Sequence, residues 1–268
     1  MLVKNFLKIL KKEEGFALVE VAIALIVMGI VLGVGLPSFL HYLQWQKIRE
    51  TKEKQEKIFY SVASFVLQNG FIPLPADPHE KGDSFGLSRP AADTSSDLRG
   101  IIPFKTLGLP EDYARDGFNR YFTYIGGAPQ KAIIDLSNQA SFCQTVPLHS
   151  IEIDEHRPGG GYVKRSSGMT AQNPIVLIIL SHGESGYGAY YGISGSVKQL
   201  RGAIQGGADK RQNASLSLRV ISRASSKKHQ DFFDDMVMWV TRENLMAFYA
   251  KSPCQSYEKQ TEYGYSFI

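Results

Sequence analysis

The sequence is poor in cysteine and in net charge. Only two of its 268 residues are cysteines, and no C-x-x-C pair or Cys/His cluster has the spacing of zinc ligands. The formal net charge is only +4 at pH 7, and no linear cluster combines basic with aromatic residues as a groove for DNA would. The sequence therefore does not indicate a zinc protein, and it does not specifically indicate a nucleic-acid partner.

Complete motifs for hydrolysis and for phosphate binding are also lacking. Residues 183–187, Gly-Glu-Ser-Gly-Tyr, lack the second glycine of the G-x-S-x-G nucleophile elbow. Ser181 and His182 follow a predicted strand, where neighbours point to opposite faces, so they cannot act as a nucleophile and its base. The glycines at 183, 186 and 188 do not form G-x-G-x-x-G. We therefore expect no enzyme and no catalytic residues.

What the sequence does contain is a long apolar run at residues 16–39, FALVEVAIALIVMGIVLGVGLPSF. As a helix this run is about 36 Å long, which is enough to cross a hydrocarbon core of about 30 Å. One carboxylate, Glu20, lies inside the run, and a carboxylate at the centre of a membrane helix costs roughly 2.5 to 3.5 kcal/mol. The sequence therefore predicts a transmembrane helix over 16–39 in which Glu20 requires a partner.

A short polar leader, residues 1–15, precedes the apolar run. It carries four lysines against two glutamates, so without it the formal net charge falls from +4 to +2. The positive-inside tendency keeps such an end in the cytoplasm and sends the rest of the chain outward. A cleaved secretory signal and an ordinary signal anchor stay alternatives, because residues 32–35 could host a weak cleavage site and basic residues also follow the run.

Residues 15–20, Gly-Phe-Ala-Leu-Val-Glu, resemble the processing signal of type IV prepilins and type II secretion pseudopilins. Pro37 matches the proline that kinks the helix in that family. The resemblance implies that a prepilin peptidase cuts between Gly15 and Phe16 and methylates the new amine of Phe16. It further implies that Glu20 pairs with the N-terminal ammonium of a neighbouring subunit and sets the register between subunits.

Beyond Pro37 the helical periodicity continues. Apolar residues at positions 58, 59, 62, 65 and 66 fall on one face of a helix, and Asn69 and Gly70 supply a stop signal. Residues 40–70 are therefore predicted to continue the helix in amphipathic form and to cover a sheet. Residues 47–57 alternate basic with acidic side chains, which is typical of a solvated helix face, although a DNA contact there stays an alternative.

Residues 71–268 are predicted to form an extracytoplasmic globular domain. Residues 73–100 hold four prolines and read as an irregular connection. Strands are predicted within 121–125, 174–181 and 234–240, of which 174–181 is a continuous apolar run suited to a central strand.

A short helix is predicted to begin between Thr241 and Asn244, with Leu245, Phe248 and Tyr249 facing the core.

Three blocks of the globular domain resemble pseudopilin segments in their order along the chain. They are 116–124, where an Asp-Gly-Phe-Asn turn leads into a strand, 181–186 after a central strand, and 234–240 with its tryptophan. The resemblance implies an α+β, pilin-like fold in which a long N-terminal helix packs on an antiparallel β-sheet. Residues 127–173 and 187–230 exceed a compact pseudopilin, so the chain resembles a large minor pilin-like subunit.

Cys143 and Cys254 both fall in the part predicted to lie outside the cytoplasm. In an oxidising compartment an even pair is a candidate disulfide, which would close a loop of about 110 residues and stabilise by roughly 4 to 5 kcal/mol. Two separate buried thiols are the alternative.

No cofactor is expected, with calcium as the one alternative. The resemblance implies that a loop near the closing strand can hold Ca²⁺, and Asp234 and Asp235 occupy the comparable place. Two adjacent carboxylates are few for an ion that takes six to eight oxygens, and a strand boundary capped by aspartate explains them equally.

The expected function is that of a structural subunit, a minor pilin or pseudopilin, of a type IV pilus or type II secretion pseudopilus. Its expected location is the inner membrane, with a single span, a cytoplasmic N-terminus and a periplasmic domain that enters a filament after assembly. Expected partners are the prepilin peptidase, other pilin or pseudopilin subunits and the inner-membrane assembly platform. The alternative is a signal-anchored periplasmic enzyme or binding receptor that does not polymerise. The sequence does not separate pilus, secretion and DNA-uptake systems.

Overall fold

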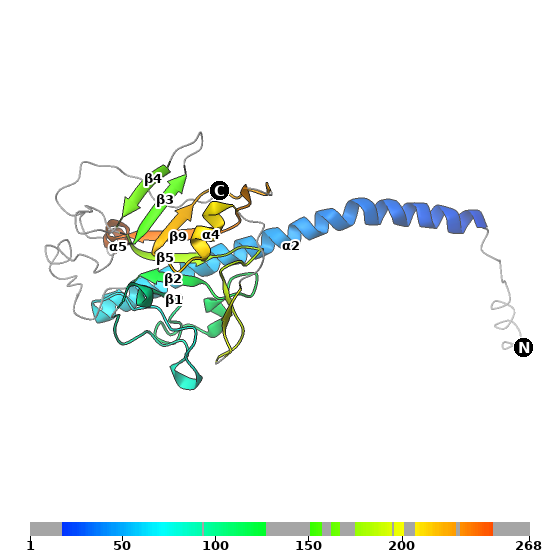
Figure 1. Cartoon of the computed structure of the whole chain (residues 1–268). Coiled ribbons are helices and arrows are strands. Elements are labelled where there is room, and N and C mark those ends of the chain that lie inside the picture. Colours follow the sequence, from blue (N-terminus) through cyan, green and yellow to red (C-terminus); the bar gives the residue numbers. More distant parts are fainter. Residues whose placement is uncertain are drawn as a thin grey trace, which may run out of the picture. The chain divides into compact units, whose positions relative to one another are not determined.

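The computed structural model describes residues 18–92, 94–126, 151–156, 162–166, 175–194, 196–200, 207–228 and 231–248. The chain divides into two compact units, Met1–Gln46 and Lys47–Ile268. In Figure 1 the colours follow the sequence, and the larger elements are labelled. The leader, Gly15, Phe16 and both cysteines lie outside the described residues.

Helix α2 (Leu18–Asn69) has 52 residues and belongs to the first unit up to Gln46. The prediction of one helix of about 50 residues that ends near residue 70 is confirmed. The helix stops where Gly70 takes a φ of 76°, and the N–H of Gly70 donates to the carbonyl of Val66 at 2.8 Å. A left-handed residue at this position is the usual glycine stop. By its length and composition α2 is able to cross a membrane.

The second unit buries the predicted apolar stripe of α2 except for Phe65, which is half-buried. Ile58, Val62 and Val66 are fully buried in a core cluster with side chains of the sheet strands. Gln55, a polar residue that precedes this stripe on α2, is buried as well. Its side-chain amide donates to the carbonyls of Ile179 at 3.0 Å and Met236 at 3.1 Å, so it joins the helix to two strands.

The main sheet is antiparallel and has the strand order β1-β2-β5-β9. Its strands are β1 (Arg99–Ile101), β2 (Thr123–Gly126), β5 (Ile175–Ser181) and β9 (Met236–Thr241). The three predicted strands are confirmed with shifts of about two residues at their starts, and the antiparallel sheet is confirmed with them. Strand β1 was not predicted, because it begins inside the proline-rich stretch.

Both faces of the main sheet are covered. Tyr124, Ile179 and Val240 pack into the cluster that contains the second part of α2. Their neighbours in the strands, including Ile125 and Ile178, pack into a second cluster. Successive residues of a strand face opposite sides, so a strand covered on both sides is a continuous apolar run, as β5 is.

A second sheet supplies the cover on the other face. Its order is β4-β3-β8, with β3 (Glu152–His156), β4 (Tyr162–Ser166) and β8 (Arg219–Ser222). Strands β3 and β4 are antiparallel, whereas β3 and β8 are parallel. Ile153 of β3 and Val220 of β8 lie in the same cluster as Ile125 and Ile178. This layer was not predicted.

The remaining elements are short. They are the 3₁₀ helices η1 (Gly82–Ser84), η2 (Ser95–Leu98) and η3 (Glu111–Ala114), the strands β6 (Tyr190–Tyr191) and β7 (Lys198–Gln199), and the helices α4 (Ala208–Ala214) and α5 (Arg242–Phe248).

Helix α5 confirms the predicted short helix. The N–H of Asn244 donates to the hydroxyl of Thr241 at 3.2 Å, which caps the helix start. Leu245 is 2% exposed, as predicted, but Phe248 is 42% exposed, so its predicted core position is wrong. The ring of Phe248 lies at the end of α5 and packs edge-on against the ring of Phe59 on α2, with 5.6 Å between centroids.

Candidate functional site

The predicted site residues that the structure describes, Glu20 and Pro37, both lie on α2. Glu20 is exposed and lies in the first turn of the described helix. The helix continues through Pro37, whose ring nitrogen carries no hydrogen for the carbonyl four residues earlier. The predicted kink at Pro37, the cleavage and methylation at Gly15 and Phe16, and the pairing of Cys143 with Cys254 stay predictions.

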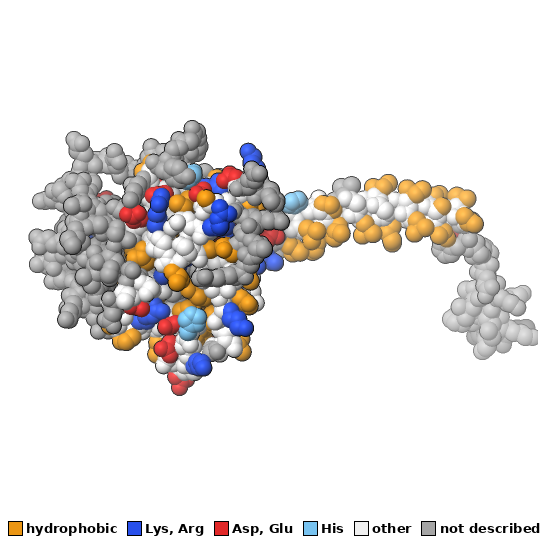
Figure 2. Space-filling model, in the orientation of Figure 1, with side chains coloured by type: hydrophobic (Ala, Val, Ile, Leu, Met, Phe, Trp, Pro, Cys, Tyr) orange, Lys and Arg blue, Asp and Glu red, His pale blue; other side chains and the backbone are white. Residues whose placement is uncertain are grey.

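The first unit exposes apolar side chains of α2, and Figure 2 shows them along the visible face of the helix. The described Val, Leu, Ile, Met and Phe side chains of residues 18–40 are 44–86% exposed. A helix that is apolar all round is typical of a membrane span or of the centre of a larger assembly. Tyr42 and Trp45 follow the apolar stretch and are exposed too, and such aromatic residues favour the level of the lipid head groups.

In the second unit, a tight turn at residues 116–120 contacts α2. Asp116 is buried, and its side chain accepts hydrogen bonds from the N–H groups of Phe118 at 2.9 Å and Arg120 at 3.0 Å. The hydroxyl of Ser181 donates to the same carboxylate at 2.6 Å. Burial raises the pKa of Asp116, and these hydrogen bonds oppose the rise. One aspartate therefore fixes the turn and ties it to the end of β5.

Gly117 brings this turn into contact with the helix backbone. Its N–H donates to the hydroxyl of Thr51 at 3.0 Å, and that hydroxyl donates to the carbonyl of Lys47 at 2.7 Å. A Cβ atom on Gly117 would lie 2.2 Å from the carbonyl oxygen of Lys47. The close approach explains why position 117 is a glycine.

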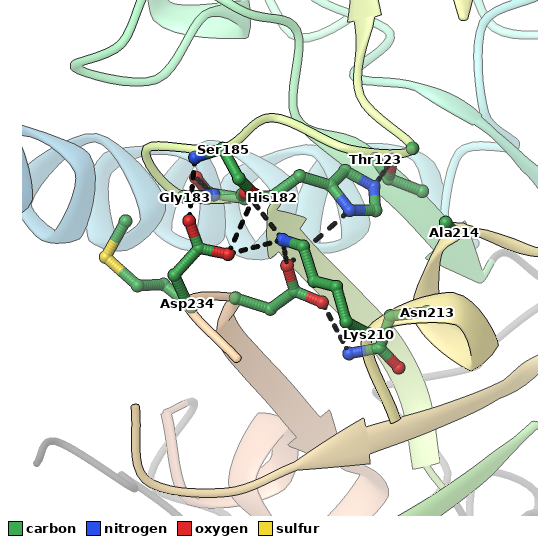
Figure 3. Close-up of polar contacts among 12 residues, drawn as sticks. Thr123, His182, Gly183, Ser185, Lys210, Asn213, Ala214 and Asp234 are labelled. Atoms are coloured by element: carbon green, nitrogen blue, oxygen red, sulfur yellow. Dashed lines mark hydrogen bonds and ion pairs between the residues drawn. The ribbon is translucent and has the colours of Figure 1, made fainter. Parts of the chain in front are cut away.

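A buried polar cluster joins the end of β5, helix α4 and the start of β9. Lys210 on α4 is 0% exposed. Its ammonium donates to the carbonyl of His182 at 2.8 Å, to Oδ1 of Asp234 at 2.6 Å and to Oδ1 of Asp235 (Figure 3). Asn213, one turn further along α4, donates to Oδ2 of Asp235 at 2.8 Å. We refer to these five residues as the Lys210 cluster.

His182 takes part in this cluster as a buried imidazole. Its Nε2 lies 3.1 Å from the hydroxyl of Thr123, and its Nδ1 lies 3.7 Å from Oδ1 of Asp235. Burial lowers the pKa of His182, and the nearby Asp235 only partly opposes this. The imidazole is therefore neutral at pH 7. Ser181 bonds to Asp116, so Ser181 and His182 take different partners, as expected for neighbours at the end of a strand.

The residues around Asp234 and Asp235 do not fit a calcium ion. Both carboxylates contact the Lys210 ammonium, and Figure 3 shows Lys210 next to Asp234. The pKa of Asp235 is lowered, because the charge of Lys210 and the contact with His182 outweigh the effect of burial. In the part of the chain that the structure describes, no group of three or more His, Cys, Asp or Glu side chains is placed to hold a metal.

Because of this cluster, we expect the folded state to lose stability in acid. The folded chain holds the pKa of His182 below its ordinary value of 6.5, so the unfolded chain binds more protons as the pH falls below that value. Stability is therefore full above about pH 6.5 and declines below it. We expect the unfolding temperature of the full chain in detergent micelles to fall between pH 7 and pH 5.

The matched variants are His182→Gln, which removes the buried imidazole, and His79→Gln, which removes an exposed one. We expect a weaker pH dependence for His182→Gln and an unchanged one for His79→Gln. Equal slopes for all three proteins would show that His182 does not cause the acid sensitivity.

Sequence reasoning missed Lys210 and Asn213. Both lie in the segment 187–230, for which no element was predicted. Together with Ala214 they form the buried face of α4. Because two of these three residues are polar, apolar periodicity does not reveal the helix.

Comparison of the chain with protein-family models, with curated protein sequences and with solved structures finds no match in any of the three.

Proposed function

We propose that the chain is a structural subunit of a filament of the type IV pilus or type II secretion pseudopilus kind, with a pilin-like fold. The observation that carries the proposal is the single helix α2. Its first part is apolar on all sides, apart from the early Glu20, and its later part is amphipathic and covers an antiparallel sheet. The six residues Gly15–Glu20 that resemble a prepilin processing signal lie at the start of this helix and just before it.

The proposed mechanism is assembly and involves no chemical step beyond processing of the chain itself. In the membrane, the apolar part of α2 is solvated by lipid, because its side chains present apolar surface in all directions. In a filament, the same surface packs against the helices of neighbouring subunits. Removal of 15 residues would bring the new ammonium of Phe16 to the helix end that also carries Glu20.

Glu20 gives the assembly its register in this proposal. A carboxylate in an apolar helix bundle is costly unless a charge of opposite sign pairs with it. The N-terminal ammonium of a neighbouring subunit is such a charge, and it reaches Glu20 only at one axial offset between the two helices. A subunit at another offset leaves both charges without a partner.

Pro37 fits a filament or membrane position as well. Proline removes one hydrogen bond of the helix and favours a bend. The freed carbonyl belongs to Gly33, four residues earlier, and the glycines at 33 and 35 carry no side chain that would hinder a local change of backbone. The proposal therefore places the flexible point of α2 inside its apolar part.

The direct test is the N-terminus of the mature protein. We expect mass spectrometry of the full chain, produced together with a prepilin peptidase, to find a chain that begins at Phe16 with one methyl group on its amine. Without the peptidase the leader should stay in place. Gly15→Leu should block cleavage, whereas Gly29→Ala, at a position with open space around it, should leave cleavage unchanged.

Two outcomes would contradict the proposal. One is an intact leader in the presence of an active peptidase, and the other is a mature chain that starts beyond the apolar run. Either outcome would favour an anchored or secreted protein that does not polymerise.

A further inference from the structure

We propose that Lys210 is an internal cation: its ammonium fills a cation site made by His182, Asp234 and Asp235, so that the domain needs no calcium there. This inference concerns the stability of the second unit and is independent of filament assembly. It gives a physical reason against the alternative of a calcium ion at Asp234 and Asp235.

The oxygens around the ammonium form the kind of cage that binds a cation. They come from one backbone carbonyl, that of His182, and from two carboxylates. Each carboxylate is held in place by further donors. The N–H of Ser185 donates to Oδ2 of Asp234 at 2.7 Å, and its hydroxyl donates to Oδ1 at 3.0 Å.

The second carboxylate, that of Asp235, is held by Asn213 of α4. Asn213 donates to its Oδ2, while the Asn213 oxygen accepts the N–H of Ile221 on β8 at 2.7 Å. Both carboxylates are thus fixed before any ion is considered, as metal-binding carboxylates usually are. The ammonium completes a site whose oxygens point inward (Figure 3).

The charges balance without a metal ion. Asp234 and Asp235 bring two negative charges, and Lys210 brings one positive charge into contact with both. Arg99 is the second positive group. It is buried, burial lowers its pKa to about 10, and it experiences the charge of Asp235. The guanidinium therefore stays protonated at pH 7, and the neutral His182 adds no charge.

Calcium would meet a poor site while Lys210 is present. Ca²⁺ takes six to eight oxygens at about 2.3 to 2.6 Å, and three oxygens surround the ammonium here. A divalent ion would also have to displace a fully buried ammonium. Unlike a bound metal ion, the Lys210 ammonium is covalently part of α4, so it also attaches this helix to the site.

The ammonium therefore connects three segments that are distant in sequence. The carbonyl of His182 lies 28 residues before Lys210, and Asp235 lies 25 residues after it. Without the ammonium, the buried carboxylate of Asp235 and the partly buried carboxylate of Asp234 would face each other with no charge between them, which is strongly destabilising. The end of β5 and the start of β9 would then be pushed apart, and α4 would lose its attachment to both.

The test uses the full chain in detergent micelles. The chain has two tryptophans, Trp45 and Trp239. In a Trp45→Phe background, the fluorescence of the buried Trp239 on β9 reports unfolding next to the cluster. The unfolding temperature is measured in a calcium chelator and in millimolar CaCl₂, for the parent protein and for each variant.

Three results are expected. The parent protein should unfold at the same temperature in chelator and in CaCl₂. Lys210→Met, which keeps the length of the side chain but removes its charge, should lower the unfolding temperature by about 10 °C. The control Lys198→Met, at an exposed lysine, should leave the unfolding temperature unchanged.

A second variant separates charge from packing and covers the case in which Lys210→Met does not fold. In Lys210→Met/Asp234→Asn/Asp235→Asn the uncompensated charges are removed as well. We expect this protein to fold and to unfold at a higher temperature than Lys210→Met. An equal or lower value would show that the loss is not one of charge balance and would overturn the proposal.

Two further results would overturn it. The first is a rise of several degrees in the unfolding temperature of the parent protein in CaCl₂, which would mean that the carboxylates bind the metal. The second is a Lys210→Met protein as stable as its parent. The N-terminus and filament formation do not enter these measurements, so failure of this inference leaves the proposed function unaffected.

Discussion

Glu20→Ala is expected to lower incorporation into filaments by about tenfold or more while membrane insertion stays intact. In the proposed assembly, the variant leaves the ammonium of Phe16 buried without its partner, and removal of one member of a buried ion pair costs about 3 to 5 kcal/mol. Insertion has no such dependence, because replacing a carboxylate by alanine makes the apolar segment a better membrane span. The measurement is the ratio of this chain in sheared filaments to that in the membrane fraction.

Two companion variants make the result specific. Glu20→Gln keeps the shape of the side chain without its charge and should behave like Glu20→Ala. Glu20→Asp keeps the charge on a shorter side chain and should retain part of the incorporation. Normal incorporation of Glu20→Ala would refute the register role of Glu20.

Gly117→Ala is expected to destabilise the second unit by about 3 kcal/mol, which corresponds to a drop of roughly 6 to 12 °C in unfolding temperature. The added Cβ would lie 2.2 Å from the carbonyl oxygen of Lys47. That oxygen belongs to the helix backbone and cannot rotate away as a side chain could. The turn must therefore withdraw, and its hydrogen bond to Thr51 is lost.

The matched control is Gly207→Ala. This glycine precedes α4, and its nearest neighbours to an added Cβ, at 3.4 Å or more, are in ordinary contact. We expect a change of less than about 0.5 kcal/mol for the control. An unfolding temperature for Gly117→Ala equal to that of the control would show that the turn does not depend on its close approach to the helix.

The elements that sequence reasoning predicted are those that a local sequence pattern marks, namely a stop signal, an apolar run or a helix cap. The end of α2 at Asn69 follows from the glycine after it. Strand β5 is readable as a continuous apolar run because α2 covers one side of the sheet and the second sheet covers the other. The start of α5 is readable from Thr241 and Asn244, since a cap acts within one turn.

The elements that escaped prediction depend on contacts between distant segments. Strand β3 has a charged or titratable residue at four of its five positions, Glu-Ile-Asp-Glu-His. Its place is set by pairing with β4 on one side and with β8 on the other. Asp154 in that strand is buried because Arg219 of β8 pairs with it. Composition alone gives no sign of such a pairing.

Contacts between distant segments also explain why only part of the Lys210 cluster was predicted from the sequence. Asp234 and Asp235 were noticed as acidic residues at a strand boundary, with calcium binding as the alternative that the resemblance implies. The ammonium that they contact comes from a helix about 25 residues earlier. A lysine in a polar segment is usually solvated, so its burial becomes evident only when three segments are brought together.

The order of strands in the main sheet has a consequence for the time course of synthesis. Strand β5 lies between β2 and β9, and Gln55 on α2 bonds to Met236, which lies 181 residues further along the chain. At roughly 5 to 20 residues per second, β9 is translated about 10 to 30 s after α2 is complete. Throughout that interval the apolar stripe of α2 lacks part of its cover, and the antiparallel sheet cannot close until nearly the whole chain has been made.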